Sequence, residues 1–294
     1  MSAAVARSHP LPPRAEAMTI EPRPMGTARR LAELWRYRRL MWFFAKSFLR
    51  KFYANTWLGK AWIPLRLGIG LVARAFVFGG ILGTPTGGVP YMVFFTVGLA
   101  AWDIFGSTML FGTRALELNR RYLKSIYVPR LVVLVAAVAP GMLWASLYGG
   151  LLMIVLAYYG IHDGTFELHL GAHTILAVAG FTLMALVALS ITLWSSVFGA
   201  MGRRDPRFIV RQVLRLWFYF TPVIYPLALV PSKFRGLMSA NPLTAPMEMV
   251  HRGLLGTGDV RTSGVAVTLG TIVVVGFFGL RFFDSSESRA LDRL

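Results

Sequence analysis

Arginines are the residues whose type and spacing point most directly to chemistry in this sequence. They gather in three clusters, one at Arg36, Arg38 and Arg39, one between positions 114 and 130, and one between positions 203 and 211. Guanidinium groups pair with phosphate oxygens in a forked geometry. The first cluster is therefore a candidate site for an anionic lipid or ligand.

Residues suited to catalysis are few. The chain has no cysteine, which excludes disulfides, thiolate metal sites and cysteine nucleophiles. The five histidines lack metal-ligand spacing, and no Gly-x-x-x-x-Gly-Lys-[Ser/Thr] loop is present to bind ATP phosphates. Glu117 and Asp205, the carboxylates in the predicted cytoplasmic connections, are too far apart to suggest a membrane glycosyltransferase. We therefore predict a chain that is not an enzyme and has no cofactor or metal of its own.

The elements that position these arginines are apolar. Hydrophobic residues make up 55% of the chain and charged residues 15%, and the mean hydropathy is +0.57, a balance that indicates a membrane protein. The formal net charge is +18, and the arginines that contribute most of it flank apolar runs. A nucleic-acid-binding protein would instead carry them as a basic patch on a soluble domain, so we predict no nucleic-acid partner. Apolar runs of about 20 residues can cross a bilayer. The chain is predicted to be an all-α membrane protein with six spans, Lys60–Gly83, Tyr91–Gly112, Leu131–Tyr159, Ala172–Gly199, Phe208–Val230 and Ser263–Phe283.

The charges of the connections predict the orientation. Lys and Arg are frequent before position 60 and in the two later clusters, whereas residues 84–90 and 160–171 contain none. Cytoplasmic loops hold the excess of Lys and Arg. Both termini are therefore predicted to be cytoplasmic, in a multi-pass protein of the inner membrane.

Segments with another composition flank the predicted membrane domain, residues 60–284. Residues 1–30 are rich in proline and lack an apolar stretch, which predicts a disordered cytoplasmic tail, and residues 285–294 are predicted to be a second tail. Residues 31–55 have an incomplete apolar stripe at helical spacing and predict an amphipathic helix in the headgroup plane. A solvated basic helix is the alternative.

Prolines and glycines interrupt the apolar stretch from Tyr225 to Arg261. This pattern predicts a pair of short, partly re-entrant helices between spans five and six, which are tolerated at membrane depth only when packed in protein or lining a water-filled path. A plain surface loop is the alternative. The candidate outer-gate residues are Pro222, Tyr225, Pro226, Asn241 and Pro242.

Several segments, in order along the chain, resemble one known family. This family comprises the Wzm-like permeases of type-2 ABC exporters, in the branch that exports O antigens, teichoic acids and other lipid-linked polysaccharides. The resemblance covers residues from about 39 to 256, with departures at Pro64 and Asp103. It rests on the segments Leu58–Trp62, Val77–Gly79, Tyr122–Arg130, Thr221–Pro226, Asn241–Thr244 and Arg252–Gly256.

The resemblance implies a homodimer that works with two copies of a separate ABC nucleotide-binding subunit, which would bind ATP and Mg²⁺. It also implies export of a polyprenyl-pyrophosphate-linked polysaccharide, such as O antigen, teichoic acid or cell-wall galactan, out of the cytoplasm. A type-2 permease that exports a drug or a lipid remains the alternative. The implied contacts to the substrate's headgroup come from Arg36, Arg38 and Arg39.

The connection between Arg114 and Arg130 is the implied coupling element to the ATPase. Its residues 116–127 are predicted to form a short helix that ends before Pro129. One set of its side chains would insert into the ATPase, and another would contact the ATPase surface. The alternative is a positively charged cytoplasmic loop that binds no partner. The inserting set is Leu116, Leu123 and Tyr127, and the surface set is Arg120, Arg121 and Lys124.

Charged residues inside spans are costly and are therefore functional candidates. Arg66 and Arg74 lie in the first predicted span, and Asp103 lies in the second at a similar height to Arg74. An Arg74–Asp103 ion pair is one interpretation, contact of Arg74 with sugar or phosphate is another, and Arg66 could reach the cytoplasmic interface. Aromatic candidates for stacking on sugars, with core or lipid packing as the alternative, are Trp217, Tyr219 and Phe220.

Overall fold

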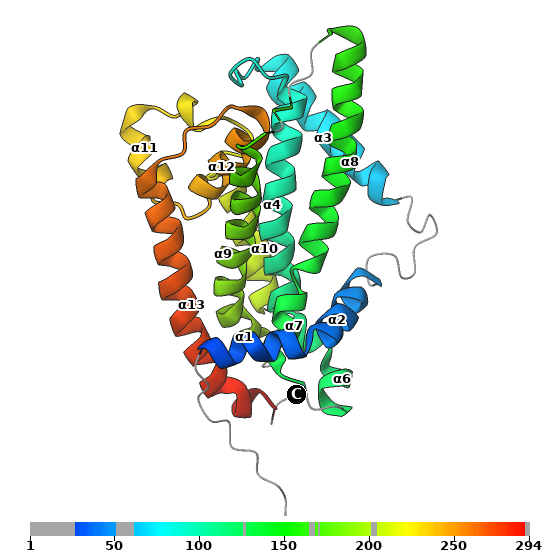
Figure 1. The fold of residues 1–294 in the computed structure, drawn as a ribbon, viewed down its shortest axis with the longest axis vertical. Coiled ribbons are helices and arrows are strands. Elements are labelled where there is room, and N and C mark those ends of the chain that lie inside the picture. The colour runs from blue at the N-terminus through cyan, green and yellow to red at the C-terminus, as the bar shows by residue number, and fades with distance from the viewer. Residues whose placement is uncertain are drawn as a thin grey trace, which may run out of the picture.

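The computed structural model describes residues 27–50, 62–125, 128–164, 168–169, 171–200 and 205–291. These residues form a helical bundle, shown in Figure 1. Its elements, in chain order, are α1 Thr27–Arg36, α2 Arg38–Arg50, α3 Trp62–Ala75, the π-helix η2 Phe76–Ile81, α4 Tyr91–Thr113, α5 Ala115–Leu118, α6 Arg120–Ser125, α7 Arg130–Ala136, α8 Ala139–His162, α9 Thr174–Ala200, α10 Asp205–Tyr219, the 3₁₀ helix η3 Leu227–Leu229, α11 Ser232–Ser239, α12 Thr244–Leu255 and α13 Thr262–Leu291.

Helix α4 is the centre of the bundle. Its sequence is apolar on most sides, and nearly all of its residues between Val93 and Thr113 are buried. A helix that is hydrophobic around its whole circumference needs neighbours on every side. Helices α3, α8, α9, α10 and α12 all contact it. The main apolar core therefore surrounds α4.

Four helical stretches in the described residues are long and apolar enough to cross a membrane: Tyr91–Thr113, Arg130–His162, Thr174–Ala200 and Thr262–Ser286. The second of these comprises α7 and α8. Proline lacks an amide N–H, and Pro140 near the start of α8 explains the break at residues 137–138. The peripheral helix α13 exposes Val273, Val274 and Phe278, as expected of a surface that faces lipid.

The other two predicted spans are present as shorter helices, so a total of six crossings remains a prediction. The first corresponds to α3 and η2, and only residues 67–81 form an apolar helix in the described part. The fifth corresponds to α10, which ends at Tyr219 and not at Val230. Pro222 explains the early end, because proline and the residue before it both disfavour the helical conformation.

The predicted terminal segments also differ in their bounds. Of the predicted N-terminal tail, residues 1–26 lie outside the described part, and α1 already begins at Thr27. At the other end α13 remains helical to Leu291, so most of the predicted tail of residues 285–294 is helix. A hydropathy profile marks only the apolar part of a helix and misses its polar continuation.

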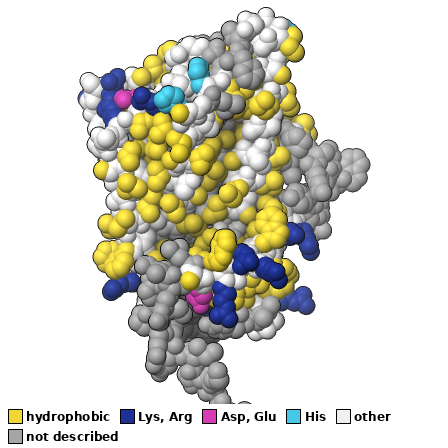
Figure 2. Space-filling view, viewed as in Figure 1, with side chains coloured by type: hydrophobic (Ala, Val, Ile, Leu, Met, Phe, Trp, Pro, Cys, Tyr) yellow, Lys and Arg dark blue, Asp and Glu magenta, His cyan; other side chains and the backbone are white. Residues whose placement is uncertain are grey.

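The two ends of the bundle carry different elements. In Figure 1 the helices α1, α2 and α6 and the end of α13 lie at the lower end, while α11 and α12 lie at the upper end. Figure 2 shows Lys and Arg side chains at both ends of a face whose middle is largely hydrophobic, with more of them toward the lower end. This arrangement agrees with the predicted cytoplasmic side, which itself remains a prediction.

Helices α9 and α12 approach each other closely at Gly180. A Cβ atom at this position would lie 2.6 Å from the carbonyl oxygen of Pro246 and 2.7 Å from Cγ2 of Val250. Small residues allow the backbones of membrane helices to come this close. Gly149 on α8 is a contrasting position, because a Cβ atom there would have no neighbour within 4 Å.

Substituting Gly180→Ala should lower the free energy of unfolding by about 1–3 kcal/mol, because the added methyl group overpacks the contact between α9 and α12. The matched control Gly149→Ala should be neutral or stabilising by up to about 1 kcal/mol, since alanine favours helix over glycine. Denaturant unfolding of the full chain in detergent, followed by tryptophan fluorescence, measures both. Equal stability of the two variants would contradict the close packing.

Candidate functional site: a cavity beside the central helix

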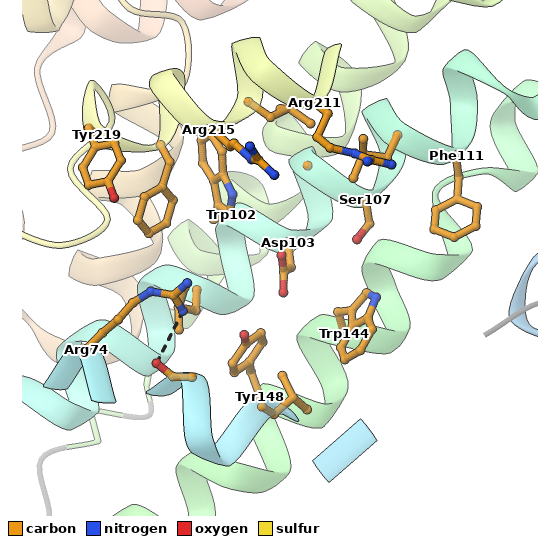
Figure 3. Close-up of a pocket in the computed structure, with 17 residues that line it drawn as sticks. Arg74, Trp102, Asp103, Ser107, Phe111, Trp144, Tyr148, Arg211, Arg215 and Tyr219 are labelled. Carbon is orange, nitrogen blue, oxygen red and sulfur yellow. Dashed lines mark hydrogen bonds between the residues drawn. The ribbon is translucent and has the colours of Figure 1, made fainter. Parts of the chain in front are cut away.

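A cavity of about 730 Å³ lies beside α4. Its walls are formed by α3, α4, α8 and α10, which come from four distant parts of the sequence (Figure 3). The cavity opens on the surface of the single chain, because Arg74, Arg211, Arg215 and Tyr219 remain exposed within it. It is therefore accessible to a ligand or to another protein surface.

The charged side chains in this cavity are mainly basic. Arg74 reaches it from α3, and Arg211 and Arg215 reach it from α10. One carboxylate, Asp103 on α4, also lines it and points into the space between Arg74 and Arg215 in Figure 3. Three guanidinium groups against one carboxylate make the cavity attractive to anions.

Aromatic side chains form much of the remaining wall. Trp102 comes from α4, Trp144 and Tyr148 from α8, and Phe218 and Tyr219 from α10. The ring of Trp102 packs edge-on against Phe218, with a centroid distance of 5.2 Å, which holds the aromatic wall together across two helices. Flat apolar faces thus lie beside the guanidinium groups.

A second, smaller cavity of about 180 Å³ adjoins the first. It is lined by Arg114 and Leu118 near α5 and by Arg207 and Arg211 on α10. The two cavities have Arg211, Leu110 and Phe111 in common. Basic side chains therefore continue from the α5 end of the bundle to the larger cavity.

The predicted ion pair between Arg74 and Asp103 is not formed. Nη1 of Arg74 donates instead to the carbonyl oxygen of Gly70, one turn earlier on α3, at 3.4 Å (Figure 3). Both side chains nevertheless line the same cavity. Arg66 belongs to α3, but its side chain lies outside the described part of the structure.

The aromatic candidates of the fifth predicted span divide among three environments. Tyr219 lines the cavity, as a stacking residue should. Trp217 packs edge-on against Phe105 in the core, at a centroid distance of 5.3 Å, and donates a hydrogen bond from Nε1 to Asn241 Oδ1 at 3.0 Å. Phe220 is 58% exposed and does not line either cavity. Successive residues of a helix point in different directions, so a run of aromatics cannot share one role.

The predicted amphipathic helix is present as α1 and α2, with a break at Tyr37. Its Arg36, Arg38 and Arg39 are exposed, and none of them lines the two cavities. The sequence placed Trp35, Trp42 and Ala45 on the apolar arc; Ala45 is buried, but Trp35 and Trp42 are exposed, and Phe44 and Phe48 are fully buried in their place. The buried face of α2 is the one that packs against α7.

The coupling connection forms two short helices, α5 and α6, separated by the buried Asn119. Arg120, Arg121 and Lys124 are exposed, as a docking surface requires. Leu116, however, is only 1% exposed and belongs to the apolar cluster beneath α2, so its predicted insertion into an ATPase is wrong. An apolar side chain in a loop fills the chain's own core when one is within reach.

The other two residues predicted to insert into the ATPase are Leu123 and Tyr127. Leu123 is half-buried against the same cluster, and Tyr127 lies outside the described residues. The aromatic side chain exposed on α6 is Tyr122, which packs edge-on against Phe43 of α2 at a centroid distance of 5.2 Å. Ser47 Oγ of α2 also donates to Asn119 Oδ1 at 3.4 Å. The amphipathic and coupling helices are thus in direct contact.

The candidate outer-gate residues lie in tight turns at the upper end of the bundle. Pro222 is buried, and Pro226 immediately precedes η3. Tyr225 donates from its hydroxyl to the carbonyl oxygen of Tyr219 at 2.7 Å. The carbonyl oxygen of Pro242 accepts from Thr268 Oγ1 at 2.8 Å. The two short helices α11 and α12 that follow are present, while their re-entrant depth and the gate role remain predictions.

Asn241 joins these turns into one unit. Its Oδ1 accepts from Trp217 Nε1 at 3.0 Å and from the backbone N–H of Leu243 at 3.1 Å. Its Nδ2 donates to the carbonyl oxygen of Phe220 at 2.9 Å and to Thr221 Oγ1 at 3.1 Å. Both ends of the amide are fully used, so Asn241 fixes the end of α10 relative to α12.

Sequence reasoning missed several residues of the cavity. Arg211 was interpreted only as an orientation marker, and Trp102, Trp144, Tyr148 and Arg215 were not singled out. Arg211 and Arg215 are four residues apart, as are Trp144 and Tyr148, and this spacing places each pair on one helix face. The spacing is a usable signal, but it does not reveal which helices face each other.

Substituting Asn241→Ala should lower the free energy of unfolding by about 2–4 kcal/mol, because it removes four hydrogen bonds and leaves the Trp217 indole N–H without its partner. Asn241→Asp retains the accepting oxygen and should lose less. Thermal unfolding of the detergent-solubilised chain compares them. A melting temperature that is the same for all three proteins would rule out this structural role.

Comparisons with known proteins find relatives that cover most of the chain, although no family model matches it. The chain is 27% identical to the O-antigen export system permease protein RfbA of Myxococcus xanthus over 224 residues, 74% of this chain and 81% of the relative. It is 24% identical to the protein of the same name from Klebsiella pneumoniae over 241 residues, 81% of this chain and 88% of the relative. The resemblance indicated by the sequence segments is thus confirmed, and this chain is similar over most of its length to the permeases of O-antigen export systems.

Proposed function

We propose that this chain is the transmembrane subunit of an ATP-driven exporter that moves a polyprenyl-pyrophosphate-linked polysaccharide across the inner membrane. One observation carries the proposal: a cavity beside the central helix combines guanidinium groups with aromatic faces. The relatives named as O-antigen export permeases support the same function. O antigen, teichoic acid and cell-wall galactan are all substrates of the proposed class.

The two kinds of side chain in the cavity suit the two parts of such a substrate. Guanidinium groups such as Arg74 and Arg215 complement phosphate oxygens. Aromatic faces such as Trp144 and Tyr148 can bury the C–H faces of sugar rings without fixing one register along the polymer. A conduit that moves a repeating polymer needs contacts that do not depend on one register. In this proposal the subunit breaks no bond in the substrate.

The energy for transport comes, in this proposal, from a separate nucleotide-binding subunit that holds ATP and Mg²⁺. The sequence has no phosphate-binding loop of the P-loop type. The exposed Arg120, Arg121 and Lys124 of α6 form the docking surface for that subunit. Contacts between α6 and α2, through Tyr122 and Phe43, would transmit its movement to the amphipathic helix.

A homodimer completes the conduit in this proposal. The cavity of one chain is bounded by four helices and remains open on the side where Arg211, Arg215 and Tyr219 are exposed. A second copy would close this side and double the lining. Arg36, Arg38 and Arg39 would meet the anionic headgroup at the membrane surface before the substrate enters the cavity.

Loss of the chain in its host should cause lipid-linked polysaccharide to accumulate on the cytoplasmic side. Restoring the chain with Arg36, Arg38 and Arg39 all replaced by alanine should restore export only in part and reduce glycan-stimulated ATPase activity several-fold, because three phosphate-pairing groups are lost. Arg50→Ala, at the exposed end of the same helix pair, is the matched control. Unchanged export by the triple variant would remove the headgroup role, and accumulation of a drug or simple lipid in place of a glycan would refute the substrate class.

Replacing Arg120, Arg121 and Lys124 with alanine should weaken co-purification of the ATPase subunit, and the difference from the unsubstituted chain should shrink as salt is added, because salt already screens these exposed charges. The melting temperature of the chain should not change. Leu116→Ala should do the opposite: it opens a cavity in the core, costs about 2–5 kcal/mol of stability and leaves the charged surface in place. Unaltered ATPase binding by the triple variant would show that α6 is not the docking surface.

A further inference from the structure

Three arginines recur every four residues along α10, at positions 207, 211 and 215. Residues four apart are neighbours on one helix face, and each step along the axis is about 6 Å. Leu214 and Phe218 line the larger cavity beside them, so this face of α10 is turned toward the interior of the site. The other face carries Ile209, Val213 and Leu216, which are exposed and apolar.

The three guanidinium groups connect the two cavities. Arg207 lines the smaller cavity, Arg215 lines the larger one, and Arg211 lines both. Arg114 extends the basic series at the α5 end, and Arg74 faces the larger cavity from α3. A row of arginines therefore leads from the α5 end of the bundle along the smaller cavity into the larger one, where Arg211 and Arg215 are exposed in the single chain.

The local contacts of these arginines leave their positive charge available. Arg207 lies over the ring of Phe208, with Cζ 5.1 Å from the centroid, and Nη1 of Arg215 donates to the neutral Gln212 Oε1 at 2.9 Å. Arg211 has no ion pair or hydrogen bond among the described residues. Arg114, in contrast, forms an ion pair with Glu117 at 3.2 Å. The row on α10 is thus not neutralised by its own helix.

Helix α10 corresponds to the fifth predicted span, and cations within a span are expensive and persist where they have a use. Rings and rows of Arg or Lys are a known device of anion and phosphate pores, because several weaker sites allow a charge to enter and also to leave. Each guanidinium can hold a phosphate in a forked geometry while the next lies about 6 Å further on. Such a row suits an anion that must move and not merely bind.

We propose that Arg207, Arg211 and Arg215 form an interior ladder along which the phosphate-bearing end of a lipid-linked substrate passes from the α5 end of the bundle into the larger cavity. The ladder rests on the proposed function, and it gives the substrate's anionic group a path distinct from the surface arginines of α1 and α2. The aromatic wall of Trp144 and Tyr148 then lies beside the sugar that follows.

Binding to the purified full-length chain in nanodiscs tests the ladder, with undecaprenyl pyrophosphate and inorganic pyrophosphate as separate probes. Trp102 and Trp144 line the cavity, so intrinsic fluorescence reports occupancy. Arg211→Gln and Arg215→Gln should each weaken undecaprenyl pyrophosphate binding about tenfold. Arg211→Lys should bind with an affinity between those of the unsubstituted chain and Arg211→Gln, because lysine keeps the positive charge but lacks the two parallel N–H donors of a guanidinium group. Arg281→Gln on α13, outside both cavities, is the matched control and should bind as the unsubstituted chain does.

The outcomes separate the ladder from the proposed function. Equal affinity in all variants, or the same loss in Arg281→Gln as in Arg211→Gln, would overturn the ladder. Arginine-dependent binding of inorganic pyrophosphate alone would overturn the lipid-linked source. Glycan accumulation on loss of the chain together with arginine-independent binding would refute the ladder and leave the function standing. Arginine-dependent binding of the lipid without any glycan accumulation would support the anion path and refute polysaccharide export.

Discussion

Helix α4 is apolar around most of its circumference, and the burial of its apolar faces shapes the bundle around it. Every neighbour must present a complementary surface, and the neighbours that come closest do so through small residues such as Gly141, where an added Cβ would lie 2.8 Å from the α4 backbone at Ile104. The cavity exists where this covering is incomplete. On that side, polar residues of α4 such as Asp103 and Ser107 line the same cavity as the basic face of α10.

The distribution of charge follows from the cost of placing ions in an apolar medium. Helix α10 carries its arginines on one face, toward the cavities, and its apolar side chains on another. The peripheral helix α13 instead shows exposed apolar residues in its central turns, such as Val273 and Phe278. The described residues therefore include a basic cavity that attracts anions and an apolar outer surface on α13 suited to lipid.

The two ends of the bundle are joined to this site by polar contacts of different kinds. At the upper end Asn241 uses both ends of its amide to hold the end of α10 against the turn before α12. At the lower end Asn119 of the coupling connection contacts Ser47 of α2, and Tyr122 packs on Phe43. Both ends are thus in direct contact with helices that line or flank the cavity.

The sequence by itself determined the class of protein, the four long spans, the charge asymmetry of the connections and the family resemblance, because composition, run length and ordered motifs are properties of the chain alone. It paired Arg74 with Asp103, whereas Arg74 donates to Gly70, and it placed Leu116 on a docking surface, whereas Leu116 is buried in the core. Tertiary structure alone decided which face of α2 is buried and that the arginines of α10 meet Trp102, Trp144 and Tyr148 in one cavity. The physical reason is that periodicity assigns residues to faces of a helix, whereas only the packing of helices distant in sequence decides what each face meets.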